Sequence, residues 1–323
     1  MRLTENAFRT TISLLAGAML VATAACGHST GSTSGAGLPS AKLTAYPAGS
    51  STQSLTFDGT QRQFIVFVPS DLPTRGSVPL VVMLHGGFGS ATQAERDYGW
   101  DELADTDHFI VTYPNGLNRA WNAGGGCCGK PATTNVNDAG FITDVVKVVQ
   151  SHENIDTSRI FATGMSNGGL MDYRLACTTD VFAAIGPVSG TLQGSCPHPE
   201  KVSVIHIHGS ADTHVPYNGG EGSGPGHVDG LSIPAVNEMW RRVDECANPS
   251  VKTSGVVTTS IAPCPDGRSV ELITVTGAGH QWPGSPDRPV VQRLLHTDTP
   301  STALNATQTI WEFFLNHPKQ PSN

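Results

Sequence analysis

The sequence carries little charge and no excess of positive charge. Its 27 Asp and Glu outnumber its 19 Lys and Arg, the net charge is −8, and only 14% of the residues are charged. Nucleic-acid binding requires a basic patch or stripe, so we expect no nucleic-acid partner. The chain also lacks a Cys-x-x-Cys pair, which argues against a zinc site built from thiolates.

Glycine, proline and apolar residues are abundant instead. The 323 residues include 36 Gly and 22 Pro, and 38% of them are hydrophobic. A chain of this length forms one large domain or two small ones and can bury a sizeable core. The composition is typical of a loop-rich globular enzyme, and no internal repeat is present.

The N-terminus has the pattern of an export signal. Arg2 and Arg9 flank the start of an apolar run, Thr11–Ala25, which at about 15 residues is shorter than the ~20 that a membrane-spanning helix needs. Small residues before Cys26 resemble a bacterial lipobox, so residues 1–25 are interpreted as a lipoprotein signal peptide and Cys26 as the lipidated residue. Simple cleavage without lipidation is the alternative. Both interpretations predict an exported protein, either anchored to the outer face of the membrane in the cell envelope or secreted.

Residues 26–52 are rich in Ser, Gly, Thr and Ala, which predicts a flexible tether without a core. We expect order from about Gln53, so that residues 53–323 form the catalytic domain.

Six cysteines follow Cys26, an even number that suggests up to three disulfides in an exported protein. Six cysteines allow 15 pairings, and the sequence does not select among them. Cys246–Cys264 is the preferred pair, because a separate polar loop joins these two residues. We do not expect Cys127 and Cys128, as neighbours, to bond each other. The other candidates are Cys177 and Cys196.

Apolar runs and helical spacing alternate along the chain, which predicts a mostly parallel sheet with helices on both faces. The expected strands are 63–69, 79–84, 109–113, one through Ile160, 182–185, 202–208 and 270–275. The expected helices are one from Asn137 or Asp138 to about Val149, one after Ser166 to Leu175, 233–243 and 306–315.

One stretch in this pattern carries a catalytic motif. Gly164–Gly168 reads Gly-Met-Ser-Asn-Gly between an apolar strand and a helix, as in the G-x-S-x-G elbow of the α/β-hydrolases. That elbow exposes a serine above the end of a sheet, so Ser166 is the candidate nucleophile. A second match, Gly27–Gly31, has no strand before it and no helix after it, and we assign it to the tether.

A serine nucleophile needs a base to take its proton and an acid to orient the base. Asp212 follows the strand that ends at His208, and His280 follows the strand that ends near Val275. They complete the chain order Ser, acid, His of the α/β-hydrolases. We therefore expect a triad of Ser166, Asp212 and His280.

The developing negative charge on a substrate carbonyl oxygen needs backbone N–H donors. One is expected from Asn167, the residue after the nucleophile. The second is expected from the glycine loop after strand 79–84, from either Gly87 or Phe88.

Trp121, Trp282 and Tyr217 are expected in loops near the proposed chemistry. We name all three as candidates for a substrate pocket, with packing in the core as the alternative for each.

A metal centre is a rival interpretation. His206, His208, Asp212 and His214 form H-x-H-x-x-x-D-x-H, and clustered His and Asp can bind zinc and activate water. This spacing differs from the H-x-H-x-D-H pattern of metallo-β-lactamases and leaves Ser166 and His280 unexplained. We therefore expect no metal, and regard His206 and His208 as hydrogen-bonded residues at a strand end.

Four ordered stretches together resemble a known family. They are Pro79–Ala91, Gly164–Cys177, His206–Gly220 and Gly277–Gly284. They are similar to the secreted esterases that include polyhydroxybutyrate depolymerases and feruloyl esterases, and the likeness runs from about Gln53 to the C-terminus.

The resemblance implies an α/β-hydrolase fold, no cofactor and a carboxylic ester hydrolase that works through an acyl-enzyme on the Ser166–Asp212–His280 triad. The implied partner is an ester substrate, namely a polyester, a hydroxycinnamoyl ester or an acetyl ester, with membrane contact only through a lipid anchor at Cys26. Acyl transfer on the same triad, or a non-catalytic surface-binding protein on a hydrolase scaffold, are the alternatives.

Overall fold

The structure is a computed structural model that describes residues 44–73 and 75–320. The expected signal peptide, Cys26, the Gly27–Gly31 motif and much of the expected tether lie outside the described residues.

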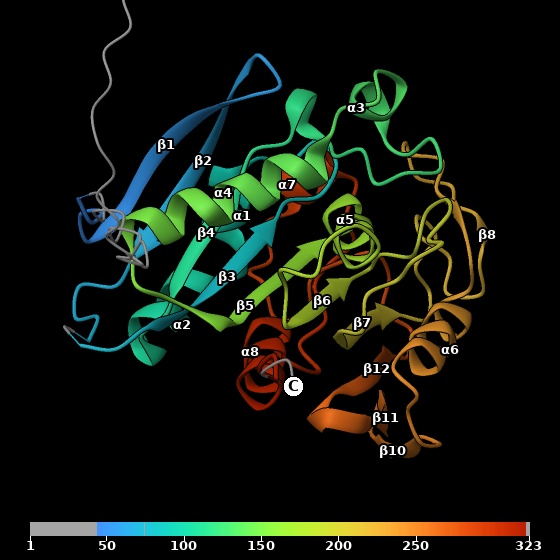
Figure 1. The fold of residues 1–323 in the computed structure, drawn as a ribbon. Helices are drawn as coiled ribbons and strands as arrows, with labels where there is room; N and C mark the ends of the chain where they lie inside the picture. Colours follow the sequence, from blue (N-terminus) through green and yellow to red (C-terminus); the bar gives the residue numbers. More distant parts are fainter. Residues whose placement is uncertain (1–43, 74, 321–323) are drawn as a thin grey trace, which may run out of the picture. The chain divides into compact units, whose positions relative to one another are not determined.

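A large sheet forms the centre of the fold (Figure 1). Its strands are β1 (Gly49–Phe57), β2 (Thr60–Val68), β3 (Val78–Leu84), β4 (Ile110–Pro114), β5 (Ile155–Met165), β6 (Ala184–Val188), β7 (Ser203–Gly209), β10 (Ser250–Ser254), β11 (Val257–Pro263) and β12 (Ser269–Val275). A separate short pair is β8 (Gly220–Glu221) with β9 (Asp229–Gly230). The helices are α1 (Ala91–Tyr98), α2 (Trp100–Asp107), α3 (Gly129–Thr133), α4 (Asp138–His152), α5 (Asn167–Ala176), α6 (Ile233–Val243), α7 (Pro289–Leu295) and α8 (Ala306–Asn316).

The strand order is β1-β2-β4-β3-β5-β6-β7-β12-β11-β10. The six strands from β4 to β12 pair in parallel, whereas β1 and β2 at one end and β11 and β10 at the other are antiparallel. The predicted mostly parallel sheet is confirmed.

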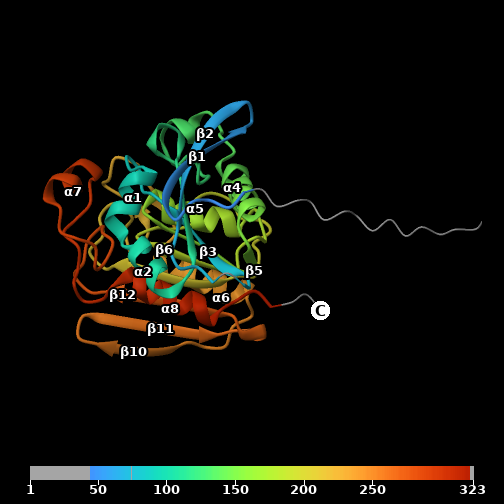
Figure 2. The same ribbon diagram turned by 90° about the vertical axis from the view of Figure 1, so that its left-hand side faces the viewer.

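Helices cover both faces of this sheet, and Figure 2 shows α1 and α4 on opposite sides of it. The alternation of side chains in β3 illustrates why both faces must be covered. Leu80 and Val82 belong to the apolar cluster that includes α4, α5 and α6, whereas Val81 and Met83 belong to the cluster that includes α1, α2 and α8. Every residue of β3 is buried.

Residues 49–52, which were expected to belong to the tether, are part of strand β1. Strand β1 begins at Gly49 and pairs with β2 along its whole length, and the Tyr46 ring stacks on His152 at 4.4 Å. The Ser- and Thr-rich composition suggested a tether. However, backbone hydrogen bonds to β2 hold this strand, and only alternate residues of it are half-buried.

Three disulfides are present among the described residues. The expected Cys246–Cys264 bond is confirmed, and Cys177 pairs with Cys196. Cys127 and Cys128 also bond each other, so the expectation that these neighbours would not pair was wrong. The peptide bond between them is cis.

Within the described residues, no helix has the length and apolar character required to cross a membrane.

Helix α5 buries a carboxyl group that has no positively charged partner. Asp172 is fully buried, and neither of its side-chain oxygens makes a hydrogen bond within the described residues. Burial raises the pKa of Asp172 well above its ordinary value, and the nearby backbone N–H of Gly164 offsets this only in part. The folded protein therefore holds this side chain in its neutral form.

This burial predicts a pH-dependent effect of Asp172→Asn on stability. In the unfolded chain the carboxyl loses its proton above about pH 4, whereas in the folded protein it keeps the proton to higher pH. Wild-type stability therefore falls as the pH rises from about 4 through the raised pKa, and an amide does not contribute to this loss. We expect Asp172→Asn to be nearly neutral at pH 4 and stabilising at pH 8 by at least about 1.4 kcal/mol, the free energy of one pKa unit.

Denaturant unfolding at both pH values measures the difference. Asp144→Asn, at an exposed position of α4, serves as the control and should show no such trend. Equal behaviour of the two variants would contradict a neutral Asp172.

Candidate active site

The expected site residues lie in loops at the carboxyl ends of neighbouring parallel strands. Gly87 and Phe88 follow β3, Ser166 follows β5, Asp212 follows β7 and His280 follows β12. Because the strands are parallel, these ends meet at one edge of the sheet. Side chains 114 positions apart in the sequence thereby come into direct contact.

Ser166 occupies a sharp turn between β5 and α5. Its φ of 56° and ψ of −118° are values that residues other than glycine rarely adopt. A Cβ on Gly164 would lie 2.5 Å from the carbonyl carbon of Gly168, and a Cβ on Gly168 would overlap the carbonyl oxygen of Leu84. The two glycines therefore allow strand and helix to meet, and the Ser166 N–H is held by the carbonyl of Val188 at 2.9 Å.

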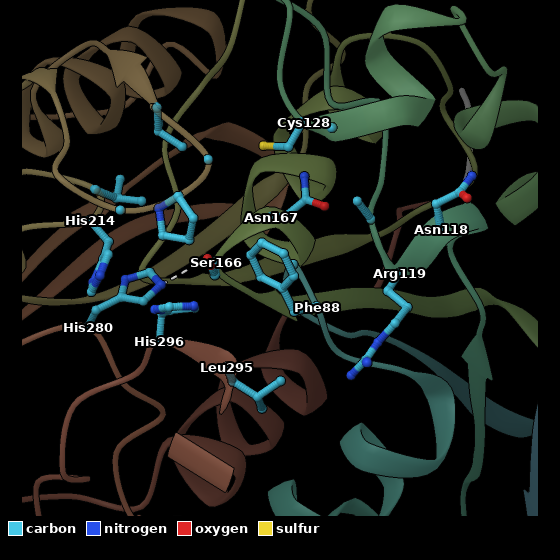
Figure 3. A pocket seen from close by; sticks show the side chains of 18 of the residues that line it. Phe88, Asn118, Arg119, Cys128, Ser166, Asn167, His214, His280, Leu295 and His296 are labelled. Carbon is cyan, nitrogen blue, oxygen red and sulfur yellow. Dashed lines mark hydrogen bonds between the residues drawn. The ribbon is translucent and has the colours of Figure 1, made fainter. Parts of the chain in front are cut away.

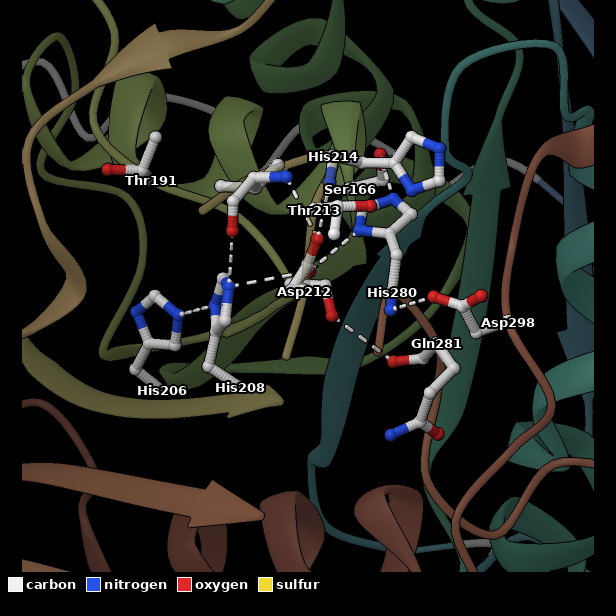
Figure 4. Close-up of polar contacts among 12 residues, drawn as sticks. Ser166, Thr191, His206, His208, Asp212, Thr213, His214, His280, Gln281 and Asp298 are labelled. Atoms are coloured by element: carbon white, nitrogen blue, oxygen red, sulfur yellow. Dashed lines mark hydrogen bonds and ion pairs between the residues drawn. The ribbon is translucent and has the colours of Figure 1, made fainter. Parts of the chain in front are cut away.

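Ser166, His280 and Asp212 form one hydrogen-bonded chain (Figure 4). His280 Nε2 lies 2.8 Å from Ser166 Oγ, and His280 Nδ1 lies 2.8 Å from Asp212 Oδ2. Since an ionised carboxylate only accepts hydrogen bonds, Nδ1 carries the hydrogen and Nε2 is left to accept one from Ser166. Asp298, which the sequence did not single out, fixes the His280 backbone by accepting its N–H at 2.7 Å.

The Asp212 carboxylate is buried, yet donors surround it. Its Oδ1 accepts the backbone N–H groups of His214 and Val215, each at 2.9 Å. Its Oδ2 faces His280, and His208 Nε2 lies 3.4 Å from the same oxygen. Burial acts to raise the pKa of Asp212, but the electrostatic attraction of the adjacent His280 ring and the hydrogen bonds from both histidines outweigh it and hold the pKa well below its usual value. Asp212 is therefore ionised at neutral pH.

The structure distinguishes between the two expected N–H donors of the glycine loop. The Phe88 N–H already donates to the carbonyl of Arg119 at 2.8 Å, so Phe88 does not fit the expected role. The N–H groups of Gly87 and Asn167 have no hydrogen-bond partner within residues 44–73 and 75–320. Both residues line the same cavity, and a Cβ on Gly87 would lie 3.9 Å from that of Asn167. This pair is therefore free to bind an oxygen atom.

A cavity of about 310 Å³ opens over Ser166 (Figure 3). The Phe88 ring, 44% exposed, stands at this cavity 5.7 Å from the ring of His296. The remaining walls come from loops and helix ends that are far apart in the sequence. These lining residues are Gly87, Asn118, Arg119, Ala120, Cys128, Gly129, Lys130, Asn167, His214, Val215, Gly224, Pro225, Gly226, Val228, His280 and Leu295.

The three aromatic residues expected in the pocket do not line it, so that expectation was wrong. Trp121 is fully buried, and its Nε1 donates to the carbonyl of His85 at 2.8 Å. Trp282 is 2% exposed, and its Nε1 donates to Thr307 Oγ1 at 3.0 Å. Tyr217 bonds through its hydroxyl to Thr274 Oγ1 at 2.9 Å. For Trp282 and Tyr217, proximity in sequence to His280 and Asp212 did not determine where the side chain points.

Sequence reasoning missed most of the residues that do line the cavity. Phe88 was expected to act only through its backbone, and His214 only as a possible metal ligand. The His214 ring packs 4.8 Å from that of His280, and a Cβ on Gly224 would overlap it. The glycine-rich segment around Gly224 was a usable signal for such a close contact, whereas nothing in the sequence placed His296 near Ser166.

The alternative metal site is not assembled as its spacing suggested. All four ring nitrogens of His206 and His208 make hydrogen bonds. The metal-ligating atoms that do come together belong to Asp212, His214 and His280, and lie within 4.8 Å of one another. Both ring nitrogens of His280 already make hydrogen bonds, one with Ser166 Oγ and one with Asp212 Oδ2. The geometry therefore favours activation of a hydroxyl group at this position.

Comparison with known proteins gives matches over much of this chain. Residues 64–214 match the family model described as Esterase PHB depolymerase. Feruloyl esterase B from Piromyces equi is 29% identical over 236 residues, which cover 68% of this chain but 42% of that protein. The bifunctional acetylxylan esterase/xylanase XynS20E from Neocallimastix patriciarum is 26% identical over 233 residues, covering 71% of this chain and 32% of that protein. The chain thus spans less than half the length of either relative.

A third relative is matched over most of its length. The protein named "Putative esterase NocK" from Nocardia uniformis subsp. tsuyamanensis is 31% identical over 246 residues, covering 66% of this chain and 68% of that protein.

Solved structures share the fold at lower sequence identity. An acetyl xylan esterase from Aspergillus awamori superimposes with a TM-score of 0.55 at 18% identity, covering 76% of this chain and 99% of that one. An S-formylglutathione hydrolase from Agrobacterium tumefaciens gives 0.51 at 11% identity, covering 85% and 98%. These likenesses support the α/β-hydrolase fold expected from the sequence. The sequence matches establish that the chain belongs to the esterase family of the polyhydroxybutyrate depolymerase and feruloyl esterase type.

Proposed function

We propose that the protein is a serine carboxylesterase that hydrolyses its substrate through an acyl-enzyme. The observation that carries this proposal is the continuous chain from Ser166 Oγ through His280 to Asp212, with two contacts of 2.8 Å, at the base of an open cavity. A hydroxyl group hydrogen-bonded to a buried, oriented imidazole is the arrangement that makes serine a nucleophile.

In the first half of the reaction Ser166 Oγ attacks the ester carbonyl carbon, and His280 Nε2 takes the hydroxyl proton. The carbonyl oxygen becomes negatively charged and accepts the N–H groups of Gly87 and Asn167. Asp212 stabilises the imidazolium that forms. Collapse of the intermediate breaks the bond to the alcohol oxygen, which receives the proton from His280, and an acyl group remains on Ser166.

In the second half a water molecule takes the place of the alcohol. The water oxygen attacks the acyl carbon while His280 accepts a proton from the water. His280 then returns a proton to Ser166 Oγ. The carboxylic acid leaves and the serine is restored. No step requires a cofactor.

We propose a polyester, a hydroxycinnamoyl ester or an acetyl ester as the class of substrate. The names of the relatives, a feruloyl esterase and an acetylxylan esterase, support an ester of this range. A cavity of about 310 Å³ lies at the small end of ligand pockets, which suits a short or single-ring acyl group.

Replacement of the nucleophile tests the proposed function directly. A fluorophosphonate probe should label wild-type protein at one site, and Ser166→Ala should lose both this labelling and ester turnover, with kcat reduced by at least about 10⁴-fold. Hydrolysis of p-nitrophenyl butyrate and mass spectrometry of the labelled peptide measure the two effects. Ser189→Ala, at the end of neighbouring strand β6, is the control and should keep the labelling at Ser166. Undiminished labelling of Ser166→Ala would rule out the proposal.

Phe88 should contribute to binding of aromatic esters through its exposed ring. Phe88→Ala removes apolar surface worth about 1 kcal/mol if half of the ring is covered by substrate, so KM for methyl ferulate should rise about fivefold. KM for methyl acetate should change little, because this ester carries no ring to cover Phe88. Leu294→Ala, at a 62% exposed position of α7 outside the cavity lining, should leave both values unchanged. Equal effects on the two substrates would contradict this role.

We also propose that the protein is exported and anchored to the membrane through Cys26. The basic and apolar segments before this cysteine support the proposal. If it is correct, Cys26→Ala expressed in a bacterial host should move the protein from the membrane fraction to a soluble exported fraction. Lipid labelling of the wild-type protein should be lost in parallel. Wild-type protein free of lipid would exclude anchoring while leaving export intact.

A further inference from the structure

A line of buried polar side chains runs behind the proposed triad and plays no part in the mechanism above. Tyr173 on α5 bonds through its hydroxyl to His206 Nδ1 at 2.7 Å. His206 Nε2 lies 2.9 Å from His208 Nδ1, and His208 Nε2 lies 2.9 Å from the carbonyl oxygen of Val215. The three side chains are at most 1% exposed.

With both imidazoles neutral, the last acceptor fixes the direction of every bond in this line. A carbonyl oxygen cannot donate, so His208 Nε2 carries the hydrogen that it shares with Val215. In a neutral imidazole the other nitrogen must then accept, so His208 Nδ1 accepts from His206 Nε2–H. By the same argument His206 Nδ1 accepts from the Tyr173 hydroxyl. All three groups therefore donate in one direction, toward the turn that contains Asp212. Figure 4 shows the rings of His206 and His208 in succession beside Asp212.

The line ends on the carboxylate of Asp212 and on the turn that holds it. His208 Nε2 lies 3.4 Å from Asp212 Oδ2, the oxygen that also accepts from His280. The Val215 carbonyl that accepts from His208 belongs to the residue whose N–H donates to Asp212 Oδ1 at 2.9 Å. His208 thus contacts Asp212 both through space and through the backbone of its turn.

The surroundings keep His206 neutral. Burial, reinforced by the neighbouring His208, lowers the pKa of His206 well below its ordinary value. Asp212 and Tyr173 are the ionisable groups at the two ends of the histidine pair. Asp172 lies next to Tyr173 on α5, and the Tyr217 ring lies beside His208. On α6 the contact to Tyr173 is the Trp240 ring, which carries no charge.

We propose that Tyr173, His206 and His208 form a relay of positioning residues that orients Asp212 and shares its negative charge. The inference rests on the proposed function, because Asp212 matters to catalysis only if it holds His280. Aligned donors polarise one another, so the hydroxyl of Tyr173 strengthens the hydrogen bonds that follow it. Asp212 is thereby held with Oδ2 toward His280, and loss of the relay affects the chemical step more than substrate binding.

Substitution of His208 tests the relay through the pH dependence of catalysis, which a loss of packing alone would not change. In His208→Leu the side chain keeps an apolar body but donates no hydrogen bond. We expect kcat per fluorophosphonate-labelled site to fall about tenfold, in line with removal of a supporting hydrogen bond around an active group, with KM within twofold of wild type. The acid limb of the kcat/KM profile should move to higher pH, because Asp212 then concentrates its charge on His280. His208→Gln has an amide nitrogen that can donate from a similar position. This variant should restore most of kcat and bring the acid limb of the profile back to its wild-type pH.

A second pair of variants keeps the test decisive if His208→Leu does not fold. Tyr173→Phe removes one buried hydroxyl from the start of the relay, and kcat should fall about two- to threefold with the acid limb displaced in the same direction. Tyr113→Phe is the matched control, because Tyr113 is also buried and also hydrogen-bonded, to Asp101 at 2.5 Å, but lies outside the relay. The relay is contradicted if Tyr173→Phe behaves like Tyr113→Phe. It is also contradicted if His208→Leu folds but keeps the wild-type kcat per labelled site and the wild-type acid limb of the kcat/KM profile. Labelling of Ser166 in all variants separates this failure from failure of the proposed function, which would abolish labelling in wild type.

Discussion

The site depends on a meeting of backbone segments that leaves no room for a side chain. The end of β5, the start of α5 and the end of β3 approach so closely that Gly164 and Gly168 cannot carry a Cβ. The chain can make this approach only by turning sharply at the residue between them, which gives Ser166 its φ of 56°. The hydrogen bond from Ser166 N–H to the Val188 carbonyl holds that conformation from the neighbouring strand. The hydroxyl is therefore exposed at the edge of the sheet by the packing of the backbone itself.

Parallel strands bring the other groups to that edge, but local bonds fix their orientation. Asn167 pairs with the backbone of Trp121, accepting its N–H at 2.6 Å and donating to its carbonyl at 3.1 Å. Trp121 in turn donates from its indole to the carbonyl of His85, just before the glycine loop at Gly87. The elbow and the loop that supply the two free N–H groups are thus joined through one buried tryptophan. Asp298 performs a similar task for His280, whose backbone N–H it accepts. These contacts allow the site to be organised before substrate arrives.

The sequence predicted the parts of the structure that depend on local signals. The core strands were recognised as continuous apolar runs, and α6 begins and ends at the predicted residues, Ile233–Val243. The Ser, Asp and His candidates were found because each follows such a strand. Strand β6 was placed too early, since Gly186 followed by Pro187 resembles a break. In the fold a Cβ on Gly186 would lie 2.7 Å from Ile310 of α8, so this glycine is set by a contact with a distant helix. Strands β10 and β11 and helix α7 were missed because they bury few apolar side chains. The cavity could not be predicted, because its walls are loops whose meeting depends on the whole sheet.

The two faces of β7 differ in a way that stability alone does not explain. Ile205 and Ile207 join the apolar cluster beneath α8, in which Phe161 and Phe314 stack at 4.6 Å. On the other face, the strand begins with the buried Val204 but continues with His206 and His208 in place of apolar residues. Buried imidazoles give little net stability compared with well-packed apolar side chains, even when every nitrogen is hydrogen-bonded. The polar pair lies on the strand that leads directly to Asp212, and its bonds all point toward that residue. A requirement of the site accounts for this placement, since packing alone would favour apolar residues on both faces of the strand.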